Sequence, residues 1–487
     1  MTINQWRALL WAILVACIAR LWVVPMLSSF WVDELVTVFV VQHPGDPSFA
    51  PVPQVPASIY YWLPRFAHQA FGDSEFAWRV PSALAMGLAL FFIGRIAARL
   101  IHPRAAWFAI FASLGLHGIN YFAADARPYG FGICVAALSV WLLIRFLDSA
   151  RWLDGMAFTV AAAFLWRIHL IYWPFYLVFA VYTALRIAKK ETRVGWWHAI
   201  GWFALLSLTL VPVALNALVV VRQAGAHVIA ELPGFREFEH AVRWSLVLIC
   251  GAGVWLVARA LKWPPVATRL PGSSQALIAL WWLGQPLAIF AFSRITGDSA
   301  FITRYVSLAL PGTALMATVV AARFIPENRW WHVSAVLGAG AVLFMGQWGT
   351  PEVRHDNSDW RAAAREEVRL ANSPEMPLIC LSPFVEARRP VWSPDYPLPG
   401  FLYSHLAYYP LKGRFYLFPF GAAASDGEDY AAKLTAETLA RSGRFVIYGA
   451  NQFWQDWFAH RPELTGWRNR LEMFGDVKMA VFEAPER

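Results

Sequence analysis

Three short stretches of this chain place ionisable side chains at the borders of long apolar runs. Asp33 and Glu34 follow the first apolar run, Asp125 and Arg127 stand between two later ones, and Arg304 opens another. A carboxylate in such a position can accept a proton from a reacting hydroxyl group. An arginine can hold a phosphate through two parallel hydrogen bonds. Together these residues predict a site where a phosphate-bearing ligand meets a proton acceptor.

Each of these groups also has an ordinary structural interpretation. Asp33 and Glu34 could lie in a solvated turn. Asp125 and Arg127 could form an interfacial ion pair that caps two helix ends, and Arg304 could extend toward water from a helix end. However, a charge at the centre of a membrane helix costs about 2.5 to 3.5 kcal/mol on insertion scales, so charges kept near membrane depth are functional candidates by default. Their position on one predicted membrane face favours a shared site.

Several neighbouring residues are candidates for supporting roles. Arg79 begins the second apolar run and has the same alternative interpretation as an arginine at a helix end. Tyr129 and Tyr305 stand beside the arginines already named, and Tyr61 belongs to a paired-tyrosine motif. His169 lies in LWRIHLIYW, where a lone histidine is more often a helix-end residue than a catalyst or ligand.

Motifs for other chemistries are absent from the sequence. It contains no GxxxxGK[ST] loop, no GxGxxG after a strand, no HExxH and no Asp-x-Asp pair, so a nucleotide donor is not expected. The 12 histidines show no metal-ligand spacing. The adjacent Asp33 and Glu34 could recruit a divalent cation from solution. The sequence therefore predicts no certain cofactor and leaves a divalent cation as an alternative.

The composition is that of an integral membrane protein. Of the 487 residues, 58% are hydrophobic and only 15% are charged, which is more apolar surface than a soluble domain needs. The formal net charge is +9, but lysines and arginines are spread singly and form no basic stripe, which argues against a nucleic-acid partner. Three of the four cysteines fall in apolar runs, so no disulfide framework is expected.

The apolar runs predict an α-helical polytopic protein with about eleven transmembrane helices. A helix needs about 20 residues to cross a bilayer. Nine single runs have about this length, and the block 152–188, between the fourth and fifth of them, fits two more helices. The nine single runs are 6–26, 78–101, 104–123, 128–147, 196–219, 241–261, 275–293, 303–323 and 331–349.

Charge counting predicts the orientation. With the N-terminus inside, the short inner loops hold more lysine and arginine than the outer ones. Residues 1–350 then form a transmembrane module, and everything after 350 lies outside. The first outer loop, 27–77, is rich in proline and aromatic residues, which favours short helices at the membrane interface. The region 351–487 changes in composition and is expected to be a separate soluble domain.

The soluble domain is expected to have an α/β fold. An amphipathic helix begins after Ser358, with Trp360 on its apolar face. Short apolar runs follow it, and a further helix is expected between the second and third of them. Helices that alternate with strand-length runs are typical of a small α/β domain. The four runs are LICL (378–381), FYLF (415–418), FVIY (445–448) and MAVF (479–482).

The ordered set of motifs resembles the GT-C glycosyltransferases that use polyprenyl-phosphate sugars. Within them, the chain is similar to the bacterial branch related to protein mannosyltransferases and lipid A aminoarabinose transferases (glycosyltransferase family 39). The resemblance runs from the first loop to the outer domain. Its motifs are WVDEL (31–35), YYWL (60–63), FGDSEFAWRVPSALA (71–85), DARPYGF (125–131), RYVSLALP (304–311) and DWRAAA (359–364).

The resemblance implies a GT-C fold and a specific reaction. A sugar would leave a polyprenyl-phosphate donor and pass, with inversion, to a lipid, glycan or protein acceptor at the outer face of the cell inner membrane, in lipopolysaccharide or cell-envelope glycan biosynthesis. Asp33 would then act as the general base, and Glu34 would orient the acceptor or the base. Arg127 and Arg304 would clamp the donor phosphate, with Arg79 as a weaker third candidate.

One stretch departs from the pattern of this family. Many relatives have a His-Pro-Pro or Lys-Pro-Pro segment before the paired tyrosines, whereas this chain reads Val-Pro-Ala-Ser at 55–58. One basic contact to the phosphate is therefore missing or comes from elsewhere.

Two other functions fit part of the pattern. In a membrane transporter or lipid flippase, charges within the membrane would line a pathway, but these charges gather on one face and no inverted repeat is visible. In a scaffold that only presents the outer domain, the carboxylates would be structural. The sequence names neither the sugar nor the acceptor.

Overall fold

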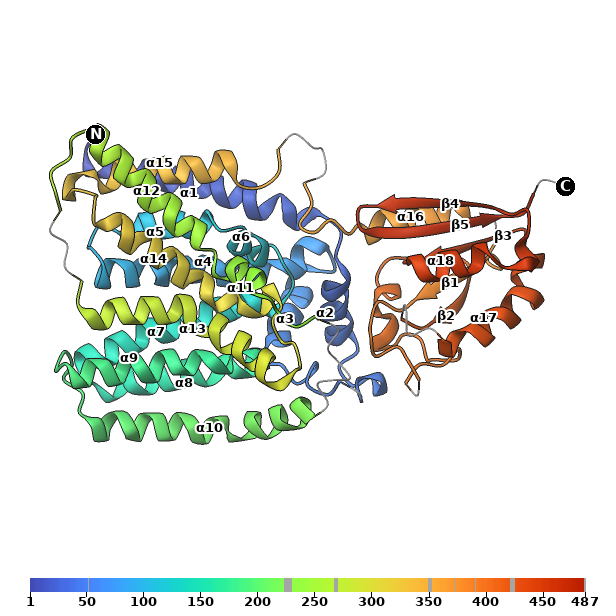
Figure 1. Cartoon of the computed structure of the whole chain (residues 1–487), viewed down its shortest axis with the longest axis horizontal. Helices are drawn as coiled ribbons and strands as arrows, with labels where there is room; N and C mark the ends of the chain where they lie inside the picture. The colour runs from blue at the N-terminus through green and yellow to red at the C-terminus, as the bar shows by residue number, and fades with distance from the viewer. Residues whose placement is uncertain are drawn as a thin grey trace.

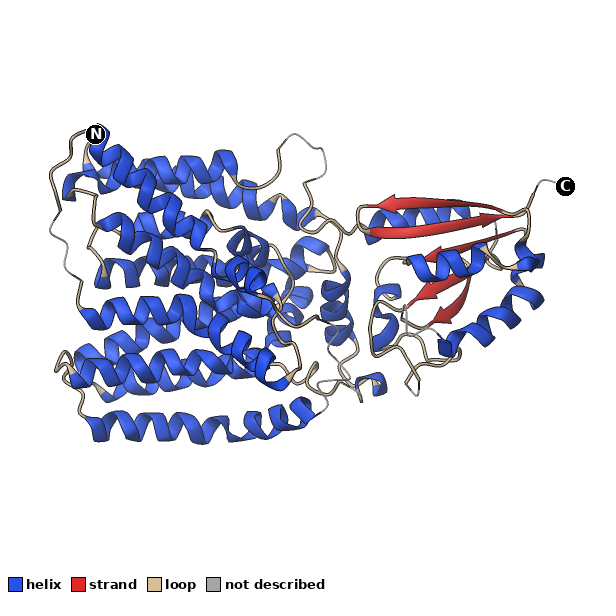
Figure 2. Ribbon diagram, in the orientation of Figure 1, coloured by secondary structure: helices blue, strands red, loops and turns tan. Residues whose placement is uncertain are grey.

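A computed structural model of the chain describes residues 1–485 except 51, 223–229, 267–269, 349–352, 372, 390 and 421–424. Most of the residues before 349 form helices that lie side by side along the long axis of the molecule (Figure 1). All the strands lie in the C-terminal domain (Figure 2). The chain thus combines a helical part with a C-terminal domain that holds the described strands.

Every predicted apolar run coincides with a helix or a pair of helices. The bounds are α1 (Ile3–Ile18), α4 (Glu75–Leu100), α5 (Ala106–Leu114), α6 (His117–Ala123), α7 (Pro128–Ser149), α8 (Trp152–Ile168), α9 (Tyr176–Ala188), α10 (Trp196–Arg222), α11 (Phe235–Val242), α12 (Trp244–Ala260), α13 (Gly272–Thr296), α14 (Leu310–Ala322) and α15 (Trp330–Phe344). A 3₁₀ helix, η7 (Thr303–Ala309), leads into α14, and another, η5 (Leu170–Phe175), leads into α9.

The predicted count of eleven spans is not confirmed. Among the described residues, seven helices are long and apolar enough to cross a membrane, or up to nine if each of two bent pairs is one span. The pair α5 and α6 bends by 80°, and the pair α11 and α12 bends by 49° at Arg243. Helices α8 and α15 have only 17 and 15 residues. A continuous apolar run does not reveal such breaks, since hydropathy is blind to backbone direction.

The segment 27–77, predicted to be the first outer loop, and the residues just before it fold into the short helices that the composition predicts. They are η2 (Pro25–Leu27), α2 (Val32–Gln42), η3 (Pro47–Phe49), η4 (Ile59–Tyr61) and α3 (Trp62–Phe71). Helix α2 is buried along most of its length, and its apolar side chains share one hydrophobic core with the C-terminal domain. It lies between the long helices and that domain (Figure 1). Its first turn carries Asp33 and Glu34.

The C-terminal domain is a five-stranded sheet with helices on both faces. Its elements are α16 (Trp360–Leu370), β1 (Pro377–Leu381), η9 (Phe401–Leu406), β2 (Arg414–Phe418), α17 (Ser425–Glu437), β3 (Arg444–Tyr448), α18 (Gln452–Ala459), β4 (Arg468–Phe474) and β5 (Val477–Glu483). The strand order is β2-β1-β3-β5-β4; β1 pairs in parallel with β2 and β3, and the β3–β5 and β5–β4 pairs are antiparallel. The four predicted strand runs lie within β1, β2, β3 and β5.

Alternation along the strands explains the two layers of helices. In β1, Leu378 and Cys380 belong to the core that contains α16 and α2, whereas Ile379 and Leu381 belong to the core formed with α17 and α18. Successive strand residues face opposite sides of a sheet, so each strand supplies both cores. One face of the sheet is thereby turned toward the first outer loop.

The turn at residues 26–29 joins the C-terminal domain to the helical part. The Ser28 hydroxyl accepts a hydrogen bond from the backbone N–H of His355 at 2.9 Å, and the Ser29 hydroxyl accepts one from that of Arg361 at 3.1 Å. The Arg361 side chain also pairs with Glu75 of α4 at 3.1 Å. This contact brings together the DWRAAA and FGDSEFAWRVPSALA motifs.

Candidate active site

Asp33 lies between two arginines that are distant in sequence. Its Oδ2 atom is 3.7 Å from Arg127 Nη2 and 3.5 Å from Arg304 Nη2. Arg127 Nη1 also donates to the backbone carbonyl of Asp33 at 2.9 Å. Charge-assisted hydrogen bonds usually measure about 2.7 to 2.9 Å, so the two side-chain pairs are looser than saturated salt bridges. The arginines therefore keep donors for another anion, and the structure brings the three predicted residues into one cluster.

The helix ends explain why these side chains converge. Asp33 is in the first turn of α2, Arg127 is the residue before α7, and Arg304 is in η7. The Arg304 guanidinium lies 5.7 Å from the ring centres of both Trp31 and Tyr305. Within the described residues, the Nε atoms of both arginines have no hydrogen-bond partner.

Glu34 and Arg79 form a fully buried pair beneath this cluster. Both side chains have 0% exposure. Arg79 Nε donates to Glu34 Oε1 at 2.7 Å and Nη2 donates to Oε2 at 2.5 Å. Three donors remain, and they bind the backbone carbonyls of Met26, Ser28 and Ser29 at 2.8 to 3.0 Å. All five N–H donors of this guanidinium are thus used.

The expected contact of Arg79 with a donor phosphate does not fit this geometry. A buried guanidinium with five protein acceptors has neither surface nor donors to offer a ligand. Glu34 likewise accepts from the backbone N–H of Ala126 at 2.7 Å and from that of Trp31 at 3.2 Å. Both residues instead hold the turn that presents Asp33. The sequence could not reveal this, because Arg79 and Glu34 meet only in the folded chain.

The supporting residues gather around the two arginines. Tyr61 lies against Arg127, whose charge partly offsets the burial that raises the pKa of the Tyr61 phenol. Tyr129 and Tyr305 lie 5.8 and 5.2 Å from the His169 ring, centre to centre. His169 Nδ1 accepts from the backbone N–H of Ile171 at 3.3 Å and so caps η5, which is the helix-end role named as its alternative.

A cavity of about 400 Å³ adjoins the cluster. Trp31, Tyr129 and Arg304 line it on the side of Asp33. Apolar side chains of α6, η7 and α14 line it as well, together with Arg243 at the bend between α11 and α12. A cavity with apolar walls and a few convergent polar groups is the usual form of a small-molecule site. This one suits a ligand with an anionic head and an apolar tail.

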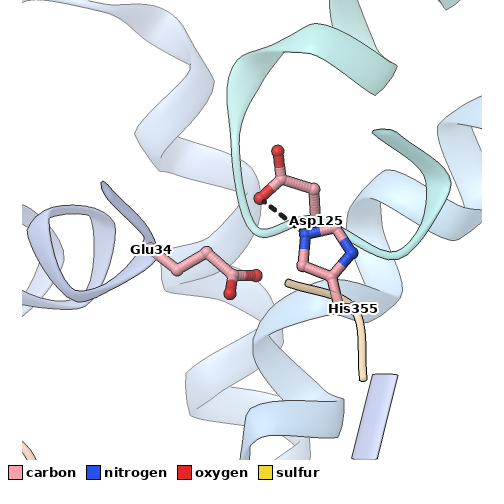
Figure 3. A group of neighbouring side chains, drawn as sticks. All are labelled: Glu34, Asp125 and His355. Atoms are coloured by element: carbon pink, nitrogen blue, oxygen red, sulfur yellow. Dashed lines mark ion pairs between the residues drawn. The ribbon is translucent and has the colours of Figure 1, made fainter. Parts of the chain in front are cut away.

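Asp125 and His355 form a second buried pair beside Glu34. Figure 3 shows the Glu34 carboxylate pointing toward the other two side chains, with Asp125 Oδ1 3.5 Å from His355 Nε2. One ligand atom from each residue lies within 4.8 Å of the others, a spacing that a metal ion could use. However, the Arg79 guanidinium already occupies both Glu34 oxygens and places a positive charge there. The group therefore fits a cation poorly.

Burial moves the pKa values of the Asp125–His355 pair in opposite directions. It raises the pKa of Asp125 from 3.8 to about 7, an effect that the nearby Arg127 charge partly offsets. It lowers the pKa of His355 from 6.5 to about 4. Near neutral pH, His355 is therefore uncharged and Asp125 is about half protonated. Trp31 Nε1 donates to Asp125 Oδ1 at 3.1 Å and ties this pair to the cavity wall.

Asp125→Asn should change how stability depends on pH. The raised pKa of Asp125 stabilises the fold fully below pH 3.8, and this contribution is lost as the pH rises to about 7. The lowered pKa of His355 stabilises it fully above pH 6.5, and this is lost as the pH falls to about 4. The two contributions oppose each other in the wild type. The variant keeps only the second, so its unfolding midpoint should rise more steeply between about pH 4 and 6.5.

Thermal unfolding of the purified protein in detergent measures this slope. Asp429→Asn, at an exposed position on α17, is the matched control and should follow the wild-type profile. Parallel profiles for Asp125→Asn and the wild type would contradict the assignment.

Three contributors to the site were missed in the sequence. His355 stands in RHDNSDW, where only the helix that follows drew notice. Trp31 was part of a motif but had no role of its own, and Arg243 lay inside the predicted apolar run 241–261 without a role. The polar run before the amphipathic helix was the one usable signal, because polar residues just after a span lie at the membrane surface.

Comparisons with known proteins support the fold. Residues 55–215 match the family model described as dolichyl-phosphate-mannose-protein mannosyltransferase. Two crystal structures of ArnT from Cupriavidus metallidurans, one bound to undecaprenyl phosphate and one in the apo state, share the fold with a TM-score of 0.57 and 14% identity. The first match covers 100% of both chains and the second 99%. A search of curated proteins gives no match. The resemblance to GT-C glycosyltransferases is thus confirmed at the level of the fold.

Proposed function

We propose that this chain is an inverting membrane glycosyltransferase. It takes a sugar from a polyprenyl-phosphate donor and transfers it to a hydroxyl or amine of a lipid, glycan or protein acceptor. The reaction takes place at the outer face of the cell inner membrane, where the C-terminal domain also lies.

The observation that carries this proposal is the position of Asp33. One of its carboxylate oxygens lies within 4.0 Å of two guanidinium groups, and Arg304 also lines the cavity of about 400 Å³. A proton acceptor, two phosphate-binding cations and an apolar cavity thus occur in one place. The ArnT structure that shares this fold was solved with undecaprenyl phosphate, and the family model describes a dolichyl-phosphate-dependent transferase. Both support a lipid-linked phosphate donor.

The chemistry follows from these positions. Arg127 and Arg304 bind the donor phosphate. Its negative charge joins that of Asp33, which already faces the two guanidinium groups in the free protein. The acceptor oxygen attacks the anomeric carbon from the face opposite the phosphate, its proton passes to Asp33, and the bond between carbon and phosphate oxygen breaks with its electron pair on the oxygen. The arginines stabilise the negative charge of the departing phosphate. Glu34 and Arg79 position the turn and do not touch the substrate.

The direct test is sugar transfer in proteoliposomes. The purified full chain receives a radiolabelled polyprenyl-phosphate sugar and a lipid extract from the source membrane, and the label in acceptor and in released polyprenyl phosphate is followed. Transfer that depends on the protein supports the proposal. Movement of donor or sugar across sealed vesicles without bond cleavage would instead support a transporter.

Arg304→Gln should weaken donor binding. The variant loses a charge-assisted contact to the phosphate, so the donor KM is expected to rise about 10-fold. Arg304→Lys keeps the charge but not the fork of donors and should fall between the two. Initial rates at varied donor concentration measure the change. Arg294→Gln, at an exposed position on α13, is the control. An unchanged KM in Arg304→Gln would show that this side chain only extends to solvent.

A further inference from the structure

A second and smaller pocket lies at one edge of the sheet in the C-terminal domain. Its volume is about 150 Å³. Leu381, the last residue of β1, and Pro383 line it together with Gly449 and Ala450, which follow β3. The carboxyl ends of two neighbouring parallel strands therefore open into it.

The order of the strands makes the carboxyl ends of β1 and β3 a favourable place for a ligand. From β1 the chain goes to β2 on one side and then crosses to β3 on the other, so the connections leave β1 and β3 in opposite directions. In open α/β sheets, ligands bind outside the carboxyl ends of the strands at such a reversal of strand order. The pocket occupies the place where this fold type ordinarily binds its ligand.

The same pocket touches the segment that carries Asp33. Trp31 lines the larger cavity and Val32 lines the smaller pocket, so neighbouring residues of one turn face different cavities. The segment 356–360 does the same, because Asp356 lines the larger cavity and Ser358 lines the smaller pocket. Two chain segments thus separate the cavities, and the next residue after Val32 is Asp33. Asp33 itself lines neither cavity, but it directly follows the two residues that do.

The lining of the smaller pocket indicates the chemistry of its ligand. Lys478 is half-buried there, and its ammonium group makes no hydrogen bond or ion pair with any residue that the structure describes. Asp476 also lines the pocket, but it is exposed and its Oδ1 atom accepts a hydrogen bond from Asn357 Nδ2 at 2.7 Å, which leaves Lys478 as the unpaired charge of the lining. The Trp360 ring offers an aromatic surface. Gly449 has φ +70°, and a Cβ atom there would lie 3.2 Å from the Trp360 ring, so glycine suits both the backbone and the ring. The space accommodates a unit of about one sugar ring.

We infer that this pocket binds the acceptor, through a monosaccharide-sized, hydroxyl-bearing unit with an anionic substituent. The apolar C–H face of this unit packs on Trp360, and Lys478 pairs with the anion. The identification of this ligand as the acceptor rests on the proposed function, because a donor in the larger cavity leaves the smaller pocket for the second substrate. The binding site itself rests only on the sheet topology and the lining residues.

Saturation-transfer NMR with the full chain in nanodiscs tests the site, with glucuronate as the acidic probe and glucose as the neutral one. Glucuronate should bind the wild type more tightly than glucose does. Lys478→Gln should weaken glucuronate binding about 10-fold or more, since it removes a charge-assisted contact, and Ser358→Leu should obstruct the pocket. Lys478→Arg should keep binding, as should Lys433→Gln, which changes an exposed lysine on α17.

Asp33→Asn separates this inference from the proposed function, because the variant should lose sugar transfer but keep glucuronate binding. If the wild-type protein binds glucuronate through Lys478 but shows no transferase activity, the binding site is supported and the proposed function is contradicted. Three results would overturn the inference: no glucuronate binding to the wild type, equal binding of glucuronate and glucose, or equal glucuronate binding to the wild type and Lys478→Gln.

Discussion

Replacing Asp33 by asparagine should lower kcat for sugar transfer by about 100-fold to 10,000-fold, the usual contribution of a positioned general base. Asparagine fills the same space but cannot take the proton of the acceptor. The donor KM should stay the same or fall, because the variant no longer places a negative charge 3.5 to 3.7 Å from the two arginines. Steady-state rates in proteoliposomes, at varied donor and fixed acceptor extract, separate the two parameters.

Asp46→Asn is the matched control. Asp46 lies in the same outer loop and caps η3 by accepting from the backbone N–H of Ser48 at 2.8 Å, a bond that asparagine can keep. Its kinetics should equal those of the wild type. A wild-type kcat in Asp33→Asn, or a higher donor KM with kcat unchanged, would remove the assignment of Asp33 as the base.

Replacing Glu34 by glutamine should destabilise the protein by about 3 to 5 kcal/mol, the usual effect of removing one partner from a buried ion pair. Arg79 would keep its charge with 0% exposure and without a counter-ion. The turn that Arg79 binds carries Asp33, so transfer activity should fall with stability. Unfolding in detergent, followed by tryptophan fluorescence against denaturant, measures the loss.

Two further variants test the cause of that effect. Replacing both residues by methionine removes both charges but leaves the backbone carbonyls of the turn at 26–29 without the Arg79 donors, so it should recover only part of the lost stability. Arg361→Gln breaks the partly exposed pair with Glu75 and should cost at most about 1 kcal/mol. If Arg361→Gln destabilises the fold as much as Glu34→Gln does, burial of the Glu34–Arg79 pair is not what matters.

Much of the fold could be predicted because hydropathy and alternation are local properties. The eleven apolar runs coincide with helices, and the runs LICL, FYLF, FVIY and MAVF lie within strands. Strand β4, RNRLEMF, was missed since it is a polar edge strand whose side chains are mostly exposed. Helix α18 was missed as well. The bends at 115–116 and at Arg243 depend on how helices pack, which one chain's hydropathy does not contain.

In the candidate site, too, the sequence predicts what depends on local patterns and misses what depends on the folded chain. The grouping of Asp33, Arg127 and Arg304 could be proposed from the sequence, because each stands at an end of an apolar run on the same predicted face. The roles of Glu34 and Arg79 could not, since two adjacent carboxylates look alike in a sequence. The geometry separates them: Glu34 is fully buried, whereas Asp33 is 16% exposed beside the two arginines.

The contacts of the turn at 26–29 have a consequence for engineering. Arg79 binds its carbonyls from α4, and the segment 355–361 binds its serine hydroxyls from the C-terminal domain. A chimera that exchanges residues 351–487 for those of a relative would have to exchange this turn and Glu75 with them. Otherwise the exchanged C-terminal domain would lose its hydrogen bonds to the turn, and the position of Asp33 would change.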